Sequence, residues 1–480
     1  MIDDFGWPRF REVFMFSPRT GCIAIAGVMA AIFLTVASAL AQQSSMPAPS
    51  PDPQIAAALK EISAVQIQRN IDQLAGFYTR QTLSSDIPPV GGRGINAAAE
   101  WIQGEFQKYS SQCGDCLEVR TDQFLQPPAP RIPQATTITN VYAVLRGTDP
   151  ANAGRIYVVT GHYDSRNSDP NDISNPAPGA NDDASGTAVS LECARVLSKH
   201  RFPATIIFLT VAGEEQGLYG SAHFAKVAKA VGWDIEAVLN NDIVGGDSTS
   251  GDAQRNPHIV RVFSEGTSST ASAEELQRIR SLGGESDGPS RQLARYLAEV
   301  ATQYLSAADF HAMLVFRHDR YLRGGDHASF NEQGFAAVRL TEYHENYNHQ
   351  HQNVRTENGI EYGDLAKFVD YDYTANVARL NAATLASLAS APAPPADVRL
   401  LTKQLQNDST LEWKASPGGL ATGYEVLWRD TTAPDWQHAK NVGNVTRVTL
   451  AVSKDNVIFA VRALDAKGHR SLAIVPQPER

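Results

Sequence analysis

Apolar positions in the first part of the chain recur at helical spacing. Between Gln54 and Thr82 they form two sets, and the five-residue step from Ile62 to Ile67 breaks the stripe. This pattern predicts a bend or two short helices, and the spacing predicts a further helix over residues 96–110.

The middle of the chain changes to short apolar runs without strict alternation. Such runs predict strands at 140–146, 155–160, 205–211, 235–243, 311–316 and 336–341, separated by helices at 183–200, 218–231, 291–305 and 363–388. Strands that are apolar on both sides predict an α/β fold, with a mostly parallel mixed sheet covered by helices on both faces. The Ser/Gly/Asp-rich stretch from Gly245 to Pro289 reads as an excursion over the functional site.

A proline-rich hinge at residues 391–396 separates this pattern from an all-β one. Apolar runs with turn residues between them predict a C-terminal all-β sandwich over residues 397–480. Trp413, Tyr424 and Trp428 resemble positions of a fibronectin type III domain. That resemblance implies a module that can bind protein or polysaccharide, and we expect peptide hydrolysis to survive removal of the chain from Pro394 onward.

The N-terminal 41 residues have the pattern of a secretory signal. An apolar run from Gly21 to Ala41 ends in Ala-Leu-Ala, which predicts a signal peptide over 1–41, a flexible lead-in over 42–54, and a periplasmic or extracellular protein. No membrane span is expected after cleavage, although about 20 apolar residues could also form an uncleaved anchor. Export favours a disulfide between Cys113 and Cys116, whereas Cys193 reads as a buried thiol.

Composition and net charge exclude several classes of protein and one class of binding partner. The 480 residues are 42% hydrophobic and 20% charged, which fits a globular protein and excludes a wholly disordered, fibrous or polytopic membrane chain. Lys plus Arg number 42 against 52 Asp plus Glu, a formal charge of −10. This balance repels phosphate backbones, so nucleic acid is not expected as a partner.

Metal-competent side chains gather in five short stretches, at residues 160–165, 179–186, 212–217, 239–242 and 343–353. Four of these follow or end a predicted strand, and ligands of open parallel sheets bind at the carboxyl ends of strands. The second stretch opens a helix, where the helix dipole favours a carboxylate.

The charges of these side chains suit two zinc ions. Two Zn²⁺ carry +4, and three carboxylates with one hydroxide carry −4. A neutral site therefore forms from Asp182, Glu215, Asp242, His162 and His349. Nitrogen and oxygen ligands without thiolates favour an open catalytic site. Glu214 is then a spare carboxylate beside a ligand, where a general base is expected.

The five stretches, in this order, resemble the co-catalytic di-zinc aminopeptidases related to aminopeptidase Y and glutamate carboxypeptidase, over about residues 55–390. The resemblance implies the zinc exopeptidase fold, two Zn²⁺ per chain, and a bridging role for Asp182. Glu215 and His349 would complete one zinc site, and His162 and Asp242 the other. Glu214 would activate a water shared by the metals, and Asp164 would orient His162. The resemblance also implies a cis peptide bond between Asp182 and Asp183.

Two segments depart from the family pattern. The last ligand usually lies in His-x-x-x-Asp-Thr; the spacing from His349 leads to Asn353, and His351 and His344 are rival ligands. Residues 318–330 resemble the family's Ser-Asp-His segment with Gly325 in place of serine, so Asp326 and His327 are expected in the substrate pocket.

The resemblance implies an exported zinc-dependent exopeptidase that acts on peptides or proteins, in the first place an aminopeptidase. A carboxypeptidase or dipeptidase of the same fold is the alternative, with Arg317, Arg320 or Arg323 as a clamp for a substrate carboxylate. A glutaminyl cyclase would use one metal, which the presence of His162 argues against. A non-catalytic binding protein, like the transferrin receptor, is the alternative from a different class.

Overall fold

The computed structural model of the chain describes residues 49–86, 92–249, 253–306 and 309–479. The predicted signal peptide and residues 42–48 of the lead-in lie outside the described residues. Within the described part of the chain, no helix combines the length and apolar character needed to cross a membrane. The predicted disulfide joins Cys113 to Cys116, and Cys193 is a buried free thiol.

The N-terminal helical region consists of α2 (Pro53–Leu59), α3 (Ala64–Ala75), the 3₁₀ helix η1 (Thr82–Asp86) and α4 (Ile95–Gln112). The predicted break after Ile62 is confirmed, because Ser63 caps α3 by accepting a hydrogen bond from the Gln66 N–H. Asp52 caps α2 in the same way. The ordered helix therefore begins within the segment predicted as a flexible lead-in.

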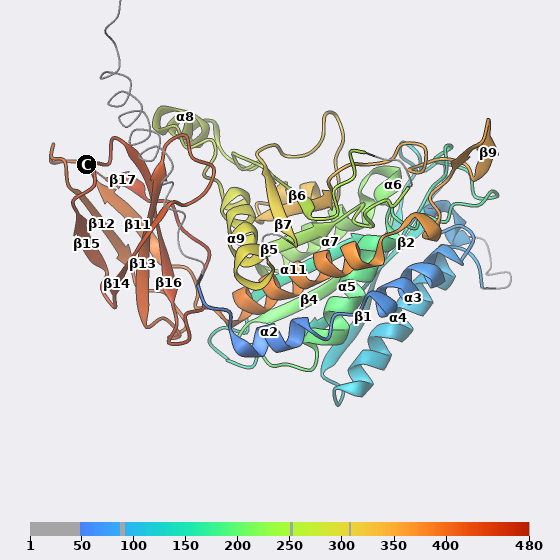
Figure 1. Ribbon diagram of the computed structural model, residues 1–480, viewed down its shortest axis with the longest axis horizontal. Coiled ribbons are helices and arrows are strands. Elements are labelled where there is room, and N and C mark those ends of the chain that lie inside the picture. The colour runs from blue at the N-terminus through green and yellow to red at the C-terminus, as the bar shows by residue number, and fades with distance from the viewer. Residues whose placement is uncertain (1–48, 87–91, 250–252, 307–308, 480) are drawn as a thin grey trace, which may run out of the picture. The chain divides into compact units, whose positions relative to one another are not determined.

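The centre of the molecule is an eight-stranded mixed sheet in the order β1-β2-β4-β3-β5-β8-β6-β7. Its strands are β1 (Leu117–Gln126), β2 (Thr136–Leu145), β3 (Arg155–His162), β4 (Thr205–Val211), β5 (Asp234–Asn241), β6 (Ile259–Ser264), β7 (His311–Val315) and β8 (Ala337–Glu342). The four central strands β4, β3, β5 and β8 run parallel. This confirms the predicted mostly parallel mixed sheet (Figure 1).

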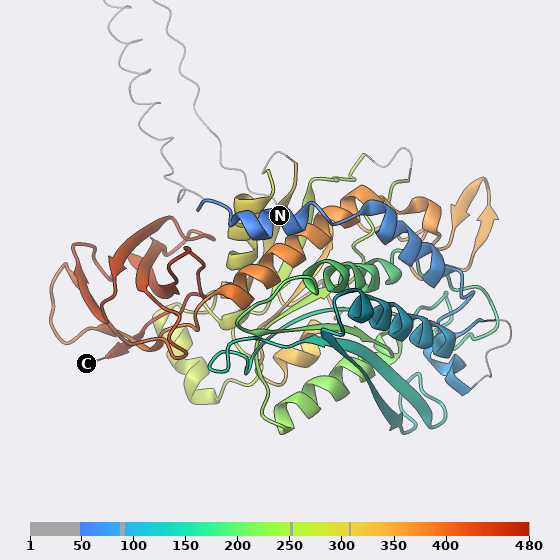
Figure 2. The ribbon, with the colours of Figure 1, turned by 90° about the horizontal axis from the view of Figure 1, so that it is seen from below.

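Helices cover both faces of this sheet (Figure 2). The helices of this part of the chain are α5 (Ala184–Leu197), α6 (Glu214–Gly217), α7 (Tyr219–Ala230), α8 (Ala273–Leu282), α9 (Pro289–Tyr304), α10 (His327–Asn331), η2 (Ala366–Phe368) and α11 (Tyr371–Ser390). Those that pack on strands of the sheet are α5, α7, α9, α10 and α11, whereas α8 has no buried residue. In β3, Tyr157 and Val159 pack in one core cluster while Ile156 and Val158 pack in another. Successive side chains of a strand point to opposite faces, which explains why the buried strands show no polar alternation.

Two strands differ from the sequence-based expectation. β1 pairs with β2 at the sheet edge, and its alternating exposed side chains gave no continuous apolar run. β6 lies inside the predicted excursion, yet it pairs with β8 and β7 in the central sheet. The remainder of that segment includes α8, which begins with a capping box formed by Ser272 and Glu275.

The C-terminal part is all-β, as predicted. One sheet has the order β15-β12-β11-β17 and the other β14-β13-β16. The strands are β11 (Ala396–Leu401), β12 (Ser409–Lys414), β13 (Gly423–Asp430), β14 (His438–Gly443), β15 (Arg447–Leu450), β16 (Val457–Leu464) and β17 (Gln477–Glu479). A small hairpin of β9 (Arg355–Glu357) and β10 (Ile360–Tyr362) lies apart from both sheets. The specific likeness to fibronectin type III stays a prediction.

The proline-rich segment that joins the two parts is packed rather than free. Ala391 is fully buried, and the Arg155 guanidinium donates to the carbonyl oxygens of Ala391 (2.9 Å) and Pro392 (3.2 Å). Across the boundary, the buried Asp287 carboxylate pairs with Arg295 of α9 (3.3 Å) and Arg429 of β13 (2.7 Å). The α/β part and the β part thus share a buried ionic contact.

Candidate metal centre

The carboxyl ends of the parallel strands bring together side chains that are distant in sequence. His162 is the last residue of β3, and Asp242 follows β5 directly. After β4, Gly213 adopts the left-handed conformation (φ 79°), and α6 then begins with Glu214 and Glu215. A Cβ at position 213 would lie 3.0 Å from the Ile138 side chain, so this tight strand-to-helix turn favours glycine.

Asp182 reaches the same place from the segment before α5. The Asp364 carboxylate accepts hydrogen bonds from the backbone N–H groups of Asn181 (2.8 Å) and Asp182 (2.7 Å). Asp183 caps α5 by accepting from the Gly186 N–H, and the Asp182–Asp183 peptide bond is cis, as the resemblance implies. These contacts fix the backbone that presents the Asp182 carboxylate.

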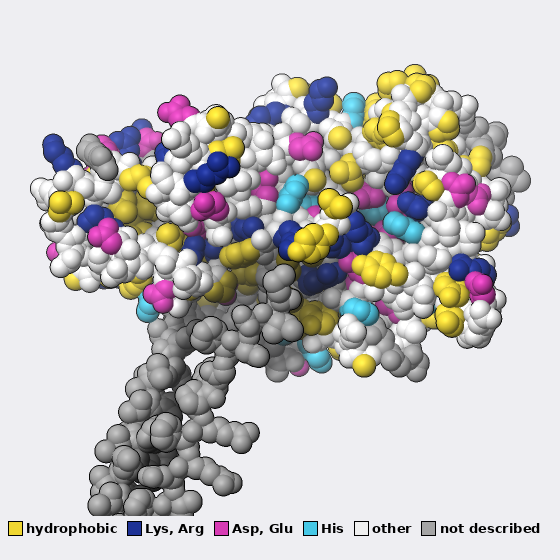
Figure 3. Space-filling model, turned by 90° about the horizontal axis from the view of Figure 1, so that it is seen from above, with side chains coloured by type: hydrophobic (Ala, Val, Ile, Leu, Met, Phe, Trp, Pro, Cys, Tyr) yellow, Lys and Arg dark blue, Asp and Glu magenta, His cyan; other side chains and the backbone are white. Residues whose placement is uncertain are grey.

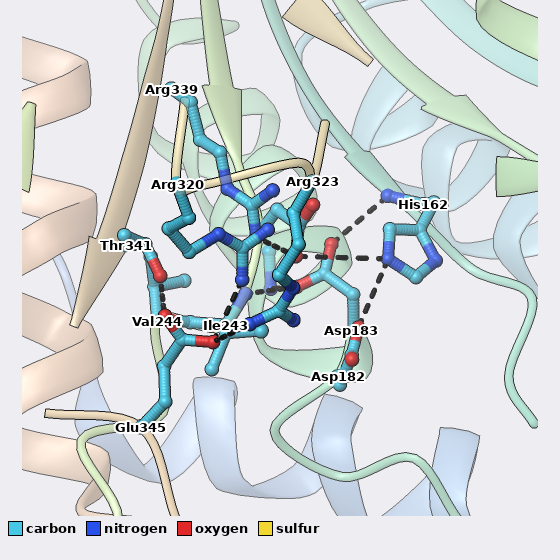
Figure 4. Close-up of polar contacts among 12 residues, drawn as sticks. His162, Asp182, Asp183, Ile243, Val244, Arg320, Arg323, Arg339, Thr341 and Glu345 are labelled. Atoms are coloured by element: carbon cyan, nitrogen blue, oxygen red, sulfur yellow. Dashed lines mark hydrogen bonds and ion pairs between the residues drawn. The ribbon is translucent and has the colours of Figure 1, made fainter. Parts of the chain in front are cut away.

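The described residues contain two groups whose ligand atoms lie within 4.8 Å of one another: His162, Glu214 and Asp242, and Asp182, Glu215 and His351. The Asp182 carboxylate lies between the two groups. Its Oδ1 is 3.2 Å from His162 Nε2, and its Oδ2 is 2.8 Å from His351 Nε2. One carboxylate therefore faces a histidine of each group, and Figure 4 shows its contact with His162.

The expectation for His349 requires correction, because the structure places His351 at this position. His351 Nε2 lies 3.0 Å from Glu215 Oε1. The His349 imidazole instead hydrogen-bonds through Nδ1 to the Asp247 carboxylate and stacks on Phe368, with ring centroids 3.8 Å apart. Asp247 thus competes for His349 and holds its ring away from the centre.

A signal for His351 was present in the sequence. Counting from His351 places Thr356 where the family pattern His-x-x-x-Asp-Thr has its threonine, with Arg355 at the aspartate position. Within the described residues, His344 belongs to neither group.

Asp164 lies where an orienting residue is expected. Its backbone oxygen is 3.1 Å from His162 Nδ1, and its Oδ1 is 3.4 Å from the same nitrogen. Its carboxylate also accepts from the backbone N–H of Glu215 (3.2 Å) and from the Thr82 hydroxyl (3.0 Å). Asp164 therefore supports both His162 and the turn that carries the two glutamates.

The buried carboxylates of the centre favour the binding of a cation. Burial raises the pKa of Glu214 well above its usual value. Burial lowers the pKa of His351, but the carboxylates of Glu215 and Asp182 raise it to about 10. Glu215 Oε1 and His351 Nε2 are buried and make no hydrogen bond. Buried lone pairs of nitrogen and oxygen that face one another fit metal ligation.

The two groups of ligand side chains lie in the wall of a cavity of about 630 Å³. Its wall includes Asp182, Glu214, Glu215, Asp242 and His351, together with Arg131, Arg166, Arg320, Leu322, Arg323, Gly324, Arg339 and Tyr347. Figure 3 shows basic side chains gathered near acidic and histidine side chains on one face of the molecule.

The expectation that Asp326 and His327 line the pocket also requires correction. Both are fully buried, and neither belongs to the cavity wall. The imidazole of His327 is held through Nε2 to the His318 carbonyl oxygen (2.9 Å), at the start of the buried helix α10. Residues just before them line the cavity instead: Arg320, Leu322, Arg323 and Gly324.

Arg339 is a residue of the centre that sequence reasoning missed, because it lies inside a buried strand. Its Nη2 is 2.8 Å from Asp242 Oδ1, and its Nη1 donates to the Gly324 carbonyl oxygen (2.6 Å). A Cβ at Gly325 would lie 2.8 Å from Arg339 Nη1. Glycine in place of the family's serine therefore leaves room for this guanidinium.

Comparison with known proteins agrees with this geometry. The model of peptidase family M28 matches residues 140–372. A probable zinc metalloprotease of Pyrenophora teres f. teres is 47% identical over 89% of this chain and 88% of its own length. Another from Leptosphaeria maculans is 46% identical over 90% of this chain and 98% of its own length. The Legionella pneumophila LapA aminopeptidase structure is 22% identical, with a TM-score of 0.48 over 70% of this chain and 75% of that one.

The extent and identity of the sequence matches settle the family. Both relatives are similar over nearly the whole chain, and the family model covers the strand ends that carry the two groups of ligand atoms. The chain belongs to peptidase family M28 and is a zinc metallopeptidase of that family.

Proposed function

We propose that the protein is an exported aminopeptidase that holds two zinc ions and removes N-terminal residues from peptides or proteins. The position of the Asp182 carboxylate carries the proposal, with Oδ1 toward His162 and Oδ2 toward His351. His162 and Asp242 would hold one zinc, Glu215 and His351 the other, and Asp182 would bridge them. Zinc, when bound, polarises a carbonyl group and lowers the pKa of water.

Glu214 is the general base in this proposal. It lies in the cavity wall next to the ligand Glu215, and its backbone N–H is 3.4 Å from Asp164 Oδ1. Its carboxylate would accept the proton of the attacking water and pass it to the nitrogen of the leaving amine. Asp164 contacts His162 through its backbone oxygen and the Glu214–Glu215 turn through its carboxylate, so one residue positions the base and two ligands.

The test replaces the Glu214 carboxylate with a neutral amide of nearly the same shape. Glu214→Gln should lower kcat about 10²- to 10⁴-fold on an aminoacyl anilide and keep its zinc content. Glu274→Gln, at an exposed position of α8, is the matched control and should keep full activity. Turnover near the wild-type rate in Glu214→Gln would reject the assignment.

Blocking the substrate amine separates the aminopeptidase from its alternatives. An aminopeptidase should lose activity when the substrate amine is acetylated, whereas a carboxypeptidase should cleave the acetylated peptide. A non-catalytic binding protein would cleave neither. Export rests on the N-terminal sequence pattern and agrees with the Cys113–Cys116 disulfide. Sequencing the N-terminus of the secreted protein should give a chain that begins near Gln42.

A further inference from the structure

Apart from the residues of the metal centre, the charged side chains described in the cavity wall are all arginines. Among its described residues, the acidic ones are Asp182, Glu214, Glu215 and Asp242, which all belong to the centre. The other charged wall residues are five arginines: Arg131, Arg166, Arg320, Arg323 and Arg339. Five arginines in one cavity wall, in a chain of net charge −10, create a local positive potential that favours a negatively charged ligand.

Three of these arginines belong to a cluster with surplus positive charge. Two buried carboxylates, Asp319 and Glu345, lie behind the wall. Glu345 accepts from Arg261 (2.8 Å), Arg320 (2.7 Å) and Arg323 (3.0 Å). Asp319 accepts from Arg320 (2.9 Å) and Arg339 (3.3 Å). Four guanidinium groups thus share these two carboxylates, and Arg339 also pairs with Asp242 (2.8 Å), so four cations contact three carboxylates. Figure 4 shows Arg320, Arg323 and Arg339 gathered near the centre.

Arg323 is a member of this cluster whose guanidinium retains N–H donors that are not hydrogen-bonded to described residues. Arg320 uses Nε, Nη1 and Nη2 on Asp319, Glu345 and the Gly324 carbonyl oxygen. Arg323 uses only Nη1, on Glu345 and the Tyr347 hydroxyl, and 32% of its side chain is exposed. No described residue accepts a hydrogen bond from its Nε or Nη2. The edge formed by these two nitrogens suits a carboxylate, which arginine binds through two parallel hydrogen bonds.

Two further arginines add to the positive potential without an acidic partner. Arg131 donates to the Glu215 carbonyl oxygen (2.9 Å), and Arg166 donates to the carbonyl oxygens of Asn167 (3.0 Å) and Ser168 (3.3 Å). Neither forms an ion pair with a carboxylate in the described part of the chain. Their charges remain available to a ligand in the cavity.

We propose that the preferred substrates carry a carboxylate next to the scissile bond, and that Arg323 binds it. This proposal rests on the proposed function, since it names the substrate class of the same site. Two groups could supply that carboxylate: the side chain of an N-terminal Asp or Glu, or the C-terminal carboxylate of a dipeptide.

Two pairs of substrates, each differing only in charge, test the proposal on the zinc-loaded wild type. One pair is glutamyl and glutaminyl p-nitroanilide, and the other is Leu-Leu and Leu-Leu-amide. The charged member of one pair should be cleaved with about tenfold higher kcat/KM, the range expected for a hydrogen bond to a charged group. The pair that shows the preference identifies the source of the carboxylate.

The variant Arg323→Gln should abolish that preference through a higher KM for the charged substrate. The preference is measured as the ratio of the two kcat/KM values within each pair, so a change that affects charged and neutral substrates alike does not alter it. Arg317→Gln is the matched control, since Arg317 is exposed, stacks on Tyr321 and lies outside the cavity wall. It should keep the preference.

Equal cleavage of both members of each pair by the wild type would overturn the proposal, whatever the variants do. A preference that survives in Arg323→Gln would also overturn it. If Arg323→Gln does not fold, Arg166→Gln provides a second test, with a reduced preference expected. Failure of the wild type to cleave any substrate, including leucyl p-nitroanilide, would instead count against the aminopeptidase activity itself.

Discussion

The buried contact between the two parts of the chain predicts that they unfold together. Asp287 lies between Arg295 and Arg429, and the three side chains are only 4%, 1% and 3% exposed. The same guanidinium groups lie over the ring of Trp436, each 5.6 Å from its centroid. Asp287→Asn would remove the carboxylate that forms an ion pair with both buried cations. Breaking a buried ion pair in this way costs about 3–5 kcal/mol.

Urea unfolding, followed by circular dichroism and by tryptophan fluorescence, measures this cost. The wild type should show coincident transitions by both probes, which a single cooperative unit requires. The matched control is Glu479→Gln, which removes the exposed Arg399–Glu479 pair (2.9 Å) and should leave the unfolding transition nearly unchanged, because solvent screens exposed ion pairs. A loss for Asp287→Asn within about 1 kcal/mol of the control would refute the reasoning.

Three further predictions concern the same molecule. Burial raises the pKa of Glu345, but the neighbouring arginines lower it to about 2. The ionised carboxylate therefore adds about 3 kcal/mol to the free energy of unfolding above pH 4.5, and this contribution is lost as the pH falls toward 2. The difference in Tm between wild type and Glu345→Gln should shrink over that pH interval. Burial lowers the pKa of His469, whereas Asp465 and Asp52 raise it above 6.5. The protonated imidazole therefore stabilises the folded protein fully below pH 6.5, and this stabilisation is lost as the pH rises through the pKa of the folded state. His469→Gln should remove this pH dependence of Tm. Deletion from Pro394 onward should abolish cooperative unfolding and peptide hydrolysis, contrary to the expectation from the hinge sequence, and an active truncated protein would contradict this.

Local sequence was sufficient to locate most of the centre. His162, Glu214, Glu215 and Asp242 each end or follow a strand whose apolar run is evident, and parallel strands place their carboxyl ends together. Asp182 could be identified because it precedes a helix with a recognisable start. Their proximity therefore follows from topology alone.

The residues that sequence reasoning misplaced depend on contacts between distant segments. The position of His349 is set by Asp247, which is 102 positions away in sequence, and by the ring of Phe368. Asp326 was expected at the pocket from its motif, but the turn before α10 exposes the preceding residues and buries Asp326. No periodicity in the sequence encodes such contacts.

Local composition located the boundary between the two parts but not its packing. The prolines between residues 391 and 396 are typical of a linker, yet this segment is held by Arg155 and buried. The stabilising contact of Asp287 with Arg429 joins residues more than a hundred positions apart. Only the tertiary structure shows that the boundary is packed.

The zinc content of three purified proteins tests the central claim most directly. After dialysis against buffer without chelator, the wild type should hold two zinc ions per chain and His351→Ala should hold one, because that variant loses a ligand of only one group. His349→Gln should keep both, since its imidazole is bound to Asp247. One zinc in the wild type, or loss of zinc from His349→Gln but not from His351→Ala, would contradict the account.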